Sequence, residues 1–420
     1  MRKIIIRDAR QVAPFNEPAR DLRVLNKPLW LFQRDVLARY CTEEREVDSL
    51  EEIEWEEGVE TLVYRDNLFF DEFFFEAFIR EAQAGGRACQ VAFSPTDRAI
   101  VHHALPLQGG IRPLNDLYVA DMWYLPRGEW AEPHPLAVDT LAREIGYYHV
   151  PTFMASEKGE MVFFVPQRAF LSIEHWVHVF MANSAFGIWA HGARIESAAE
   201  RLVTRLQVLG RALLERKQVL SSSTMVQVGR NTQIDPTAII QGPTIIGDNV
   251  IIGPGAVVTN SFIGNNVNIA QGCQVMLSVV CDRCFLPFRA ALFLTTLMED
   301  CIVAQNACLQ CCVMGRNSFV GAGTTFTDFY LIPRPSVRTM RNGVLEEVGL
   351  TVIGSCIGHN CRIGSDLMFY PARMVESDTV LVRSEKRSVI TRNISYEEGD
   401  QHQLPDGHLH PRLYPRDRRG

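Results

Sequence analysis

Small apolar residues recur at every sixth position between about Val226 and Val382, and glycine often follows them. The repeat is clearest at Ile234, Ile240, Ile246, Ile252, Val258 and, after a slip of one residue, Ile263, Ile269 and Val275. A period of six fits neither an α-helix nor an open sheet. It is typical of a β-helix built from hexapeptide repeats, three of which close one triangular coil. We therefore predict a left-handed parallel β-helix over residues 223–390.

The repeat is expected to be interrupted twice. Over residues 285–299 the six-residue register is lost in an apolar run. Residues 328–353 contain Pro333, Pro335 and the tight-turn pair Asn342-Gly343. Because binding groups concentrate in loops that leave a regular scaffold, the second excursion is a candidate site. The tail, residues 391–420, is rich in Pro, His, Asp and Arg and is predicted to be flexible.

The first half of the chain alternates strands with helices, which predicts an α/β domain with a mostly parallel sheet over residues 1–194. Expected strands are 3–6, 61–64 and 89–93, with a hairpin-like run at 161–165. Expected helices are 29–40, 71–84 and a segment around Trp176. Asp66 follows a strand at its carboxyl end, where such sheets bind ligands.

A further helix, from about Ile195 to Leu220 within a connector of residues 195–222, is expected to join the two domains. Its leucines are spaced as one helical stripe: Leu202, Leu206, Leu209 and Leu213.

The composition limits the classes of function. The 420-residue chain has a net charge of -7 and no long basic cluster, which disfavours nucleic-acid or anionic-membrane binding as the main role. The apolar segment 169–190 includes Glu174 and His178, so no membrane span is expected. The N-terminus does not resemble a signal peptide, and we expect a cytoplasmic protein.

Nine of the eleven cysteines lie between Cys273 and Cys361. Two pairs, Cys281-x2-Cys284 and Cys308-x2-Cys311, have the outline of a zinc-ligand set. Cysteine is also a small residue that stacks well inside a β-helix, and the repeat favours this structural role over Zn²⁺.

An α/β domain, a connecting helix and a hexapeptide β-helix together resemble the bifunctional enzymes that make UDP-N-acetylglucosamine. These enzymes join a sugar nucleotidyltransferase domain to a glucosamine-1-phosphate acetyltransferase domain. The run Val313–Thr324, ending in Gly-Ala-Gly-Thr, is similar to the family's repeat, and Ile357–Gly364 is similar to its return after the loop. The resemblance implies a homotrimer, an acetyl-CoA or other acyl-CoA co-substrate, and a sugar or sugar phosphate as partner.

The family's catalytic positions in the β-helix differ here. Gln305 stands where the family has a histidine base, and glutamine cannot take a proton near neutral pH. Asp328, just beyond the Gly-Ala-Gly-Thr repeat, is a candidate to replace the missing base, and His359 is a second candidate because it is the nearest histidine in the sequence. Arg383 and Lys386 are expected to meet the phosphates of the acyl-CoA.

The N-terminal resemblance lacks the family's glycine-rich phosphate loop, since residues 7–14 contain no glycine. Asp66 matches the family's Mg²⁺ ligand. The run Asn26-Lys27-Pro28-Leu29 is similar to the family's Gly-Lys-Pro-Leu, and Arg20 lies near its phosphate-contacting lysine. Trp176–Asn183 is similar to a helix of related sugar nucleotidyltransferases. The resemblance therefore implies that Lys27, Arg20 and Asn183 bind substrate. Three functions stay open: an acyl-CoA-dependent sugar transferase, a non-catalytic trimeric scaffold or sugar-nucleotide-binding protein, and a sugar-1-phosphate nucleotidyltransferase.

Overall fold

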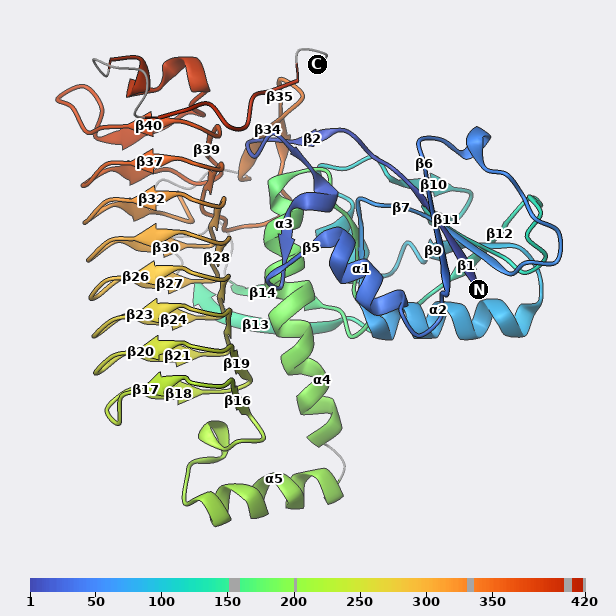
Figure 1. Ribbon diagram of the computed structural model, residues 1–420, viewed down its shortest axis with the longest axis horizontal. Coiled ribbons are helices and arrows are strands. Elements are labelled where there is room, and N and C mark those ends of the chain that lie inside the picture. The colour runs from blue at the N-terminus through green and yellow to red at the C-terminus, as the bar shows by residue number, and fades with distance from the viewer. Residues whose placement is uncertain (151–158, 200–201, 331–335, 404–409, 418–420) are drawn as a thin grey trace. The chain divides into compact units, whose positions relative to one another are not determined.

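The computed structural model describes residues 1–150, 159–199, 202–330, 336–403 and 410–417 (Figure 1). The chain divides into two compact units. The first comprises Met1–Val12, Glu17–His149 and Glu160–Phe186, and the second Ala13–Asn16, Val150–Gly159 and Gly187–Gly420. The expected α/β fold followed by a parallel β-helix is confirmed, but the sheet of the first unit is mixed and not mostly parallel.

The first unit is built on one mixed sheet with strand order β12-β9-β11-β7-β1-β6, and β10 is paired to β11. Strands β6, β1 and β7 are parallel, whereas β11 runs antiparallel to β7 and β9. Strand β1 carries an apolar run that is buried throughout, as a central strand requires. The bounds are β1 Arg2–Ile6, β6 Glu43–Val47, β7 Thr61–Arg65, β9 Cys89–Phe93, β10 Ile111–Leu114, β11 Leu117–Leu125 and β12 His134–Ala137.

Three α-helices accompany this sheet: α1 (Leu29–Leu37), α2 (Glu72–Gly85) and α3 (Trp176–Asn183). Helix α2 begins where the Asp71 carboxylate accepts a hydrogen bond from Phe74 N, and it ends at Gly86 in the left-handed conformation. Short ribbons complete the unit: β2 (Gln11–Val12) with β3 (Glu17–Pro18), β4 (Arg23–Val24) with β5 (Lys27–Pro28), β8 (Leu68–Phe70) with β15 (Phe170–Ser172), and β13 (Arg143–Val150) with β14 (Gly159–Val165).

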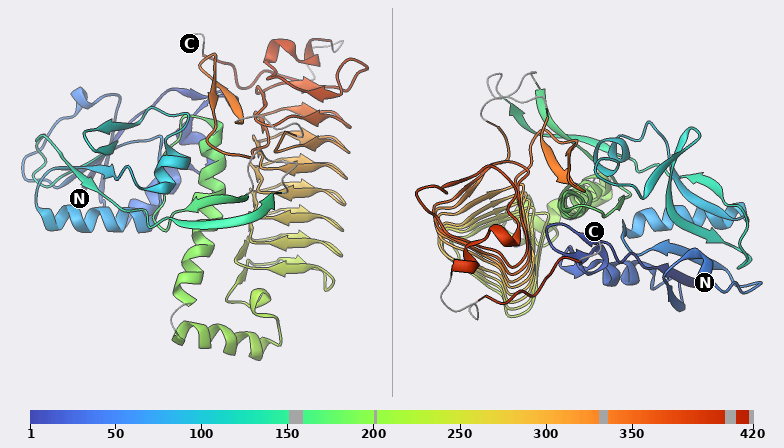
Figure 2. Two further views of the ribbon diagram at one scale, coloured as in Figure 1. Left: turned by 180° about the vertical axis from the view of Figure 1, so that it is seen from behind. Right: turned by 90° about the horizontal axis from the view of Figure 1, so that it is seen from above.

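The second unit is dominated by three parallel sheets of eight strands each, and every coil gives one strand to each sheet (Figure 2). We call the sheets faces A, B and C. Face A contains β16 (Val226–Val228), β19 (Thr244–Ile246), β22 (Phe262–Ile263), β25 (Val279–Val280), β28 (Thr296–Leu297), β31 (Val313–Met314), β36 (Cys356–Ile357) and β39 (Met374–Val375). Face B contains β17 (Gln233–Ile234), β20 (Ile251–Ile252), β23 (Asn268–Ile269), β26 (Phe285–Leu286), β29 (Ile302–Val303), β32 (Phe319–Val320), β37 (Arg362–Ile363) and β40 (Val380–Leu381). Face C contains β18 (Ile239–Gln241), β21 (Val257–Thr259), β24 (Gln274–Met276), β27 (Ala291–Phe293), β30 (Cys308–Gln310), β33 (Thr325–Phe326), β38 (Met368–Phe369) and β41 (Val389–Ile390).

The slip seen in the sequence recurs at four successive turns from face C to face A, those that lead into β22, β25, β28 and β31. Seventeen residues, not eighteen, separate the stacked core positions Ile246, Ile263, Val280, Leu297 and Met314. The interruption predicted over residues 285–299 is therefore wrong. Leu286, Leu292 and Leu297 keep their places in the core, and the shorter third step explains the apparent loss of register.

Asparagine shapes the corner between faces A and B. Asn231, Asn249, Asn266, Asn317 and Asn360 occupy equivalent places there with positive φ, a conformation that asparagine tolerates better than most residues. Their side chains also form short ladders, with Asn317 Nδ2 donating to Asn360 Oδ1 at 2.9 Å. The repeat thus fixes both the core and this corner.

The excursion after β33 is confirmed, and it contains a hairpin of β34 (Arg338–Arg341) and β35 (Val344–Glu347) with Asn342 and Gly343 in its turn. Pro333 and Pro335 lie outside the described residues.

Residues at both ends of the chain pack on the last coils. Phe15, fully buried, lies with its ring 5.0 Å from that of His359, and Asn16 Nδ2 donates to Glu376. Parts of the tail that we predict as flexible form short helices, η6 (Tyr396–Glu398) and η7 (Asp400–Gln403).

The single helix predicted from 195 to 220 is wrong. Two α-helices, α4 (Trp189–Ala199) and α5 (Leu202–Glu215), are followed by a short 3₁₀ turn, η5 (Val219–Ser221). Within the described part of the chain, no helix is both long and apolar enough to span a membrane.

Candidate functional site

Asp66 lies directly after β7, at the carboxyl end of the strand, as the sequence predicts. Its side chain is almost fully buried, with Oδ1 accepting from Asp8 N at 2.8 Å and Oδ2 3.2 Å from Arg20 Nη1. Arg20 also pairs with Glu46 at 2.8 Å. Two of the predicted site residues, Asp66 and Arg20, are therefore brought together, as an ion pair.

The burial of Asp66 raises the pKa of its carboxyl group to about 6, against the opposing effects of the Asp8 backbone amide and Arg20. A carboxylate with two donors and little access to solvent is well placed as part of a fixed polar network. Mg²⁺ coordination would require it to exchange the Arg20 contact for the ion.

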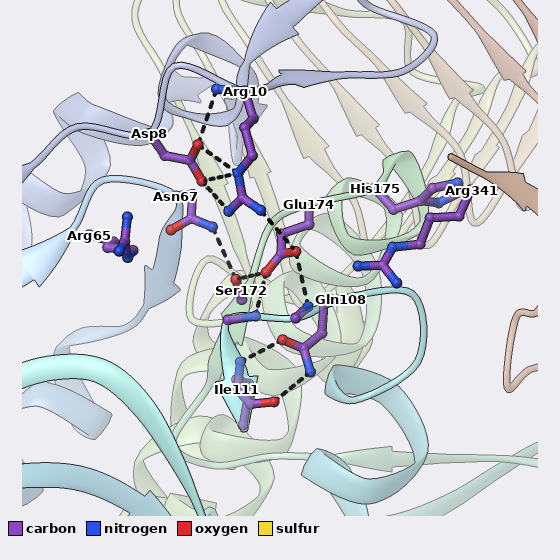
Figure 3. Close-up of polar contacts among 12 residues, drawn as sticks. Asp8, Arg10, Arg65, Asn67, Gln108, Ile111, Ser172, Glu174, His175 and Arg341 are labelled. Atoms are coloured by element: carbon purple, nitrogen blue, oxygen red, sulfur yellow. Dashed lines mark hydrogen bonds and ion pairs between the residues drawn. The ribbon is translucent and has the colours of Figure 1, made fainter. Parts of the chain in front are cut away.

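The loop after β1 is stabilised by its own side chains. Arg10 donates from Nε to both oxygens of Asp8, at 2.8 and 3.0 Å, and its Nη1 lies 3.7 Å from Glu174 Oε2 (Figure 3). Burial opposes ionisation of Asp8, but the hydrogen bonds and charge of Arg10 outweigh it and lower the pKa. The loop thus presents a paired guanidinium in place of free backbone amides.

The Glu174 carboxylate lies among hydrogen-bond donors of a kind that often binds anions. Its oxygens accept from Gly109 N at 3.0 Å, Gly110 N at 2.7 Å and Ser172 Oγ at 2.9 Å (Figure 3). A Cβ at Gly110 would lie 2.9 Å from Glu174 Oε1, so glycine is needed for this close approach. The chain supplies its own carboxylate where a phosphate would otherwise find amide donors.

The other predicted substrate-binding residues of the first unit have structural contacts. Asn183 is buried, accepts from Leu25 N at 2.8 Å and donates to Arg23 O at 3.0 Å, which holds the turn before β5. Lys27 is exposed and pairs with Asp35 at 2.6 Å. Neither contact joins these residues to Asp66.

In the β-helix the three candidate catalytic residues lie at three different corners. Gln305 follows β29 at the corner between faces B and C. Asp328 follows β33 at the corner between C and A, and His359 follows β36 at the corner between A and B. One chain therefore does not assemble them into a single constellation.

His359 is fully buried. Its Nδ1 accepts from Arg316 N at 2.9 Å, and its ring lies near those of Phe15 and Tyr414, the latter at 4.7 Å. A ring without access to solvent supports packing and not proton transfer with a diffusing substrate.

Asp328 and Gln305 differ in their access to solvent. Asp328 is buried, its Oδ2 lies 3.7 Å from Cys311 Sγ, and burial raises the pKa of its carboxyl group. Gln305 is half-buried, and its backbone oxygen accepts from Gly323 N. Asp328 therefore combines a titratable group with an altered proton affinity, whereas the Gln305 side chain does not titrate near neutral pH.

Arg383 and Lys386 lie in the loop between β40 and β41. Lys386 is exposed, and Arg383 Nη1 is 3.4 Å from Asp366 Oδ2, one coil away. This loop is at the same corner as Gln305 but three coils further along the axis.

The two cysteine pairs do not meet. Cys281 and Cys284 lie at the corner between faces A and B, whereas Cys308 is on face C and Cys311 at the corner between C and A. No cluster of three or more His, Cys, Asp or Glu side chains suited to a metal ion occurs among the described residues. Burial raises the pKa of the Cys311 thiol, which disfavours the thiolate that zinc needs.

A cavity of about 470 Å³ adjoins the excursion. It is lined by residues of the excursion and of the last coils: Tyr330, Ser336, Arg338, Leu345, Tyr370, Arg373 and Thr391. The Arg373 guanidinium is held by Pro371 O at 2.9 Å and Arg338 O at 3.1 Å, and the Tyr330 and Tyr370 rings are 6.3 Å apart in an edge-on arrangement. Aromatic faces beside fixed cationic donors suit a ligand with a ring and an anionic group.

Sequence reasoning located this excursion but missed Tyr370 and Arg373, since they lie in the turn between β38 and β39, which only the coil stacking brings beside it. Arg10 and Glu174 were missed for a similar reason: 164 positions separate them in the chain.

The hexapeptide-repeat model of bacterial transferases matches residues 225–260. Curated relatives are called bifunctional protein GlmU. That of Syntrophomonas wolfei is 27% identical over 149 residues, covering 34% of this chain and 33% of its own length. That of Heliobacterium modesticaldum is 29% identical over 171 residues, covering 39% and 37%. The chain thus matches little more than a third of these relatives.

Among solved structures, the UDP-N-acetylglucosamine acyltransferase of Campylobacter jejuni has a TM-score of 0.28 at 15% identity, covering 39% of this chain and 68% of its own. A putative acetyltransferase of Desulfovibrio desulfuricans has a TM-score of 0.26 at 18% identity, covering 40% and 30%. Such low scores add nothing to the fold described above.

Proposed function

Starting from a distant homology to the GlmU proteins and from the hexapeptide-repeat transferase fold, we propose that the chain transfers an acyl group from acetyl-CoA or another acyl-CoA to a sugar or sugar nucleotide. The reaction takes place on the β-helix of a cytoplasmic homotrimer. The observation that carries the proposal is the cavity at the excursion, because it joins aromatic and cationic side chains where the family places its loop.

The proposed chemistry needs one base. The acceptor's hydroxyl or amino group attacks the thioester carbonyl, and its proton passes to the base. The carbon–sulfur bond then breaks, and the leaving CoA thiolate takes up the proton from the base to become the free thiol. Asp328 is the proposed base, since its raised pKa brings proton uptake closer to neutral pH. Gln305 is proposed to hydrogen-bond substrate, and Arg383 and Lys386 to contact the CoA phosphates.

The first unit is proposed to be structural. A nucleotidyltransferase would use Asp66 for Mg²⁺, with Arg20, Lys27 and Asn183 on the substrate. Here Asp66 already pairs with Arg20, and Asn183 already holds a turn. The Glu174 carboxylate also takes the amides of Gly109 and Gly110.

A non-catalytic trimeric scaffold or sugar-nucleotide-binding protein is the second candidate. The separation of Gln305, Asp328 and His359 over three corners favours it.

Calorimetric titration with acetyl-CoA, together with a thiol-release assay over a panel of amino sugars and sugar nucleotides, tests the proposal. Asp328→Asn should keep acetyl-CoA binding while lowering turnover by about 10²–10⁴-fold. Asp300→Asn, at another corner, is the matched control. Absence of acetyl-CoA binding would refute the transferase. Binding of a sugar nucleotide without thiol release would support the second candidate.

A further inference from the structure

Helix α5 lies near the β16 end of the β-helix (Figure 1). This helix and the turn after it expose a set of large apolar side chains. The exposed fractions are 48% for Leu209, 82% for Leu213, 82% for Leu214, 38% for Val219 and 47% for Leu220.

The three leucines of α5 lie on one side of the helix. Leu209 and Leu213 are one turn apart and so share a face, and Leu214 adjoins Leu213. Ala212, which points elsewhere by helical rotation, is buried. The leucine stripe that the sequence predicts therefore turns, in this part of it, toward solvent and not toward the core.

Cations lie close to these leucines in the sequence. Between residues 208 and 220 the chain has Arg211, Arg216 and Lys217 against a single acid, Glu215, a local charge of +2 in a chain whose total is -7. Glu215 is engaged by Arg211 at 2.8 Å and by the backbone and hydroxyl of Ser223. Arg216 and Lys217 are exposed.

We propose that this segment, residues 208–220, docks the protein on an anionic lipid surface, with the leucines entering the interface and the cations meeting lipid phosphates. A basic amphipathic helix with exposed leucines has the pattern of a peripheral membrane anchor. A second copy of the same segment would bring like charges together, whereas an anionic bilayer complements both the apolar face and the cations. The proposal is independent of the transferase reaction.

The anchor is fixed to the β-helix. Ser221 Oγ donates to Ile240 O at 2.8 Å, and Gly242 N donates to Leu220 O at 2.7 Å. Docking would therefore hold the first coil near the surface without requiring the chain to span the bilayer.

Vesicle sedimentation tests the proposal with the full-length protein. Vesicles of phosphatidylcholine with phosphatidylglycerol should bind it, and vesicles of phosphatidylcholine alone should bind at least about tenfold more weakly. The double variant Leu213→Glu/Leu214→Glu should lose binding, and Arg216→Glu/Lys217→Glu should weaken it at least about tenfold. Leu114→Glu, an exposed leucine of the first unit, is the control and should bind like the wild type.

Equal sedimentation of the wild type and both double variants would overturn the proposal, as would the absence of binding to anionic vesicles. Light scattering tests the alternative that a second copy of the protein, and not lipid, binds this face. If Leu213→Glu/Leu214→Glu changes the molar mass in solution while the wild type ignores vesicles, the face binds a second copy and the proposal is wrong.

Discussion

The stability of the first unit should depend on pH through Asp66. The folded protein raises the pKa of this carboxyl from 3.8 to about 6, because burial disfavours the charge. Between these values the folded state binds more protons than the unfolded state, so stability falls as pH rises. This pKa difference corresponds to a loss of about 3 kcal/mol in the free energy of unfolding. The loss is complete above pH 6 and absent below the ordinary pKa of the carboxyl group.

Asp66→Asn removes this titration. An amide in place of one oxygen disturbs one of two hydrogen bonds, from Asp8 N or from Arg20, at a cost of about 1 kcal/mol. We therefore expect the variant to be more stable than the wild type by about 1–2 kcal/mol at pH 8 and no more stable at pH 4.

Urea unfolding between pH 4 and 8, followed by fluorescence of the buried Trp123 and Trp176, measures the difference. Asp116→Asn, an exposed carboxyl of the same unit, is the control. The reasoning fails if the Asp66→Asn difference stays constant across this range or grows toward low pH. Stabilisation of the wild type, but not of the variant, by millimolar Mg²⁺ would indicate that Asp66 binds the ion after all.

Three further substitutions test the packing. Leu297→Ala, in the core of the β-helix, should lower the free energy of urea unfolding by about 2–5 kcal/mol. Ile302→Ala, on an outer face, should lower it far less. Similar losses for the two variants would contradict the coil assignment. Glu174→Ala should destabilise the first unit by about 1–3 kcal/mol, because it leaves the amides of Gly109 and Gly110 without their acceptor, while the exposed Glu132→Ala should have little effect. His359→Ala should speed proteolysis near Phe15 and lower the melting temperature, because the two rings are in contact. His134→Ala is the control. If the His359→Ala variant is inactive but resists protease like the wild type, His359 acts in catalysis.

The sequence predicts the β-helix well because every coil repeats the same local rule. A buried aliphatic residue such as Ile263 or Val280 must recur with each strand, and a corner such as Asn266 must accept positive φ. The interruption predicted near Phe285 is wrong because a strict period of six was assumed, whereas the third step of each coil between Ile246 and Met314 has five residues.

The site is less predictable, since its residues meet through tertiary stacking. Arg10 reaches Glu174 only once β1 and the segment before α3 are folded beside each other. Tyr370 reaches the excursion because two coils stack, a relation with no short-range signal. Asp66 was placed correctly because it depends on a local rule, the end of a buried strand. Arg20 was expected to bind substrate, but it forms an ion pair with Asp66 instead.

The segment 13–16 has a consequence for synthesis. Asn16 is bonded to Glu376, 360 positions later, and Ser377 Oγ donates to the backbone oxygens of Pro14 and Phe15. At ordinary rates of translation, roughly 20–70 s pass between the emergence of these partners from the ribosome. Throughout that interval Phe15, fully buried in the finished protein, has no final coil to bury it. The nascent chain therefore carries an unprotected aromatic residue at Phe15 until its last coils are made, which gives chaperones a defined period in which to bind it.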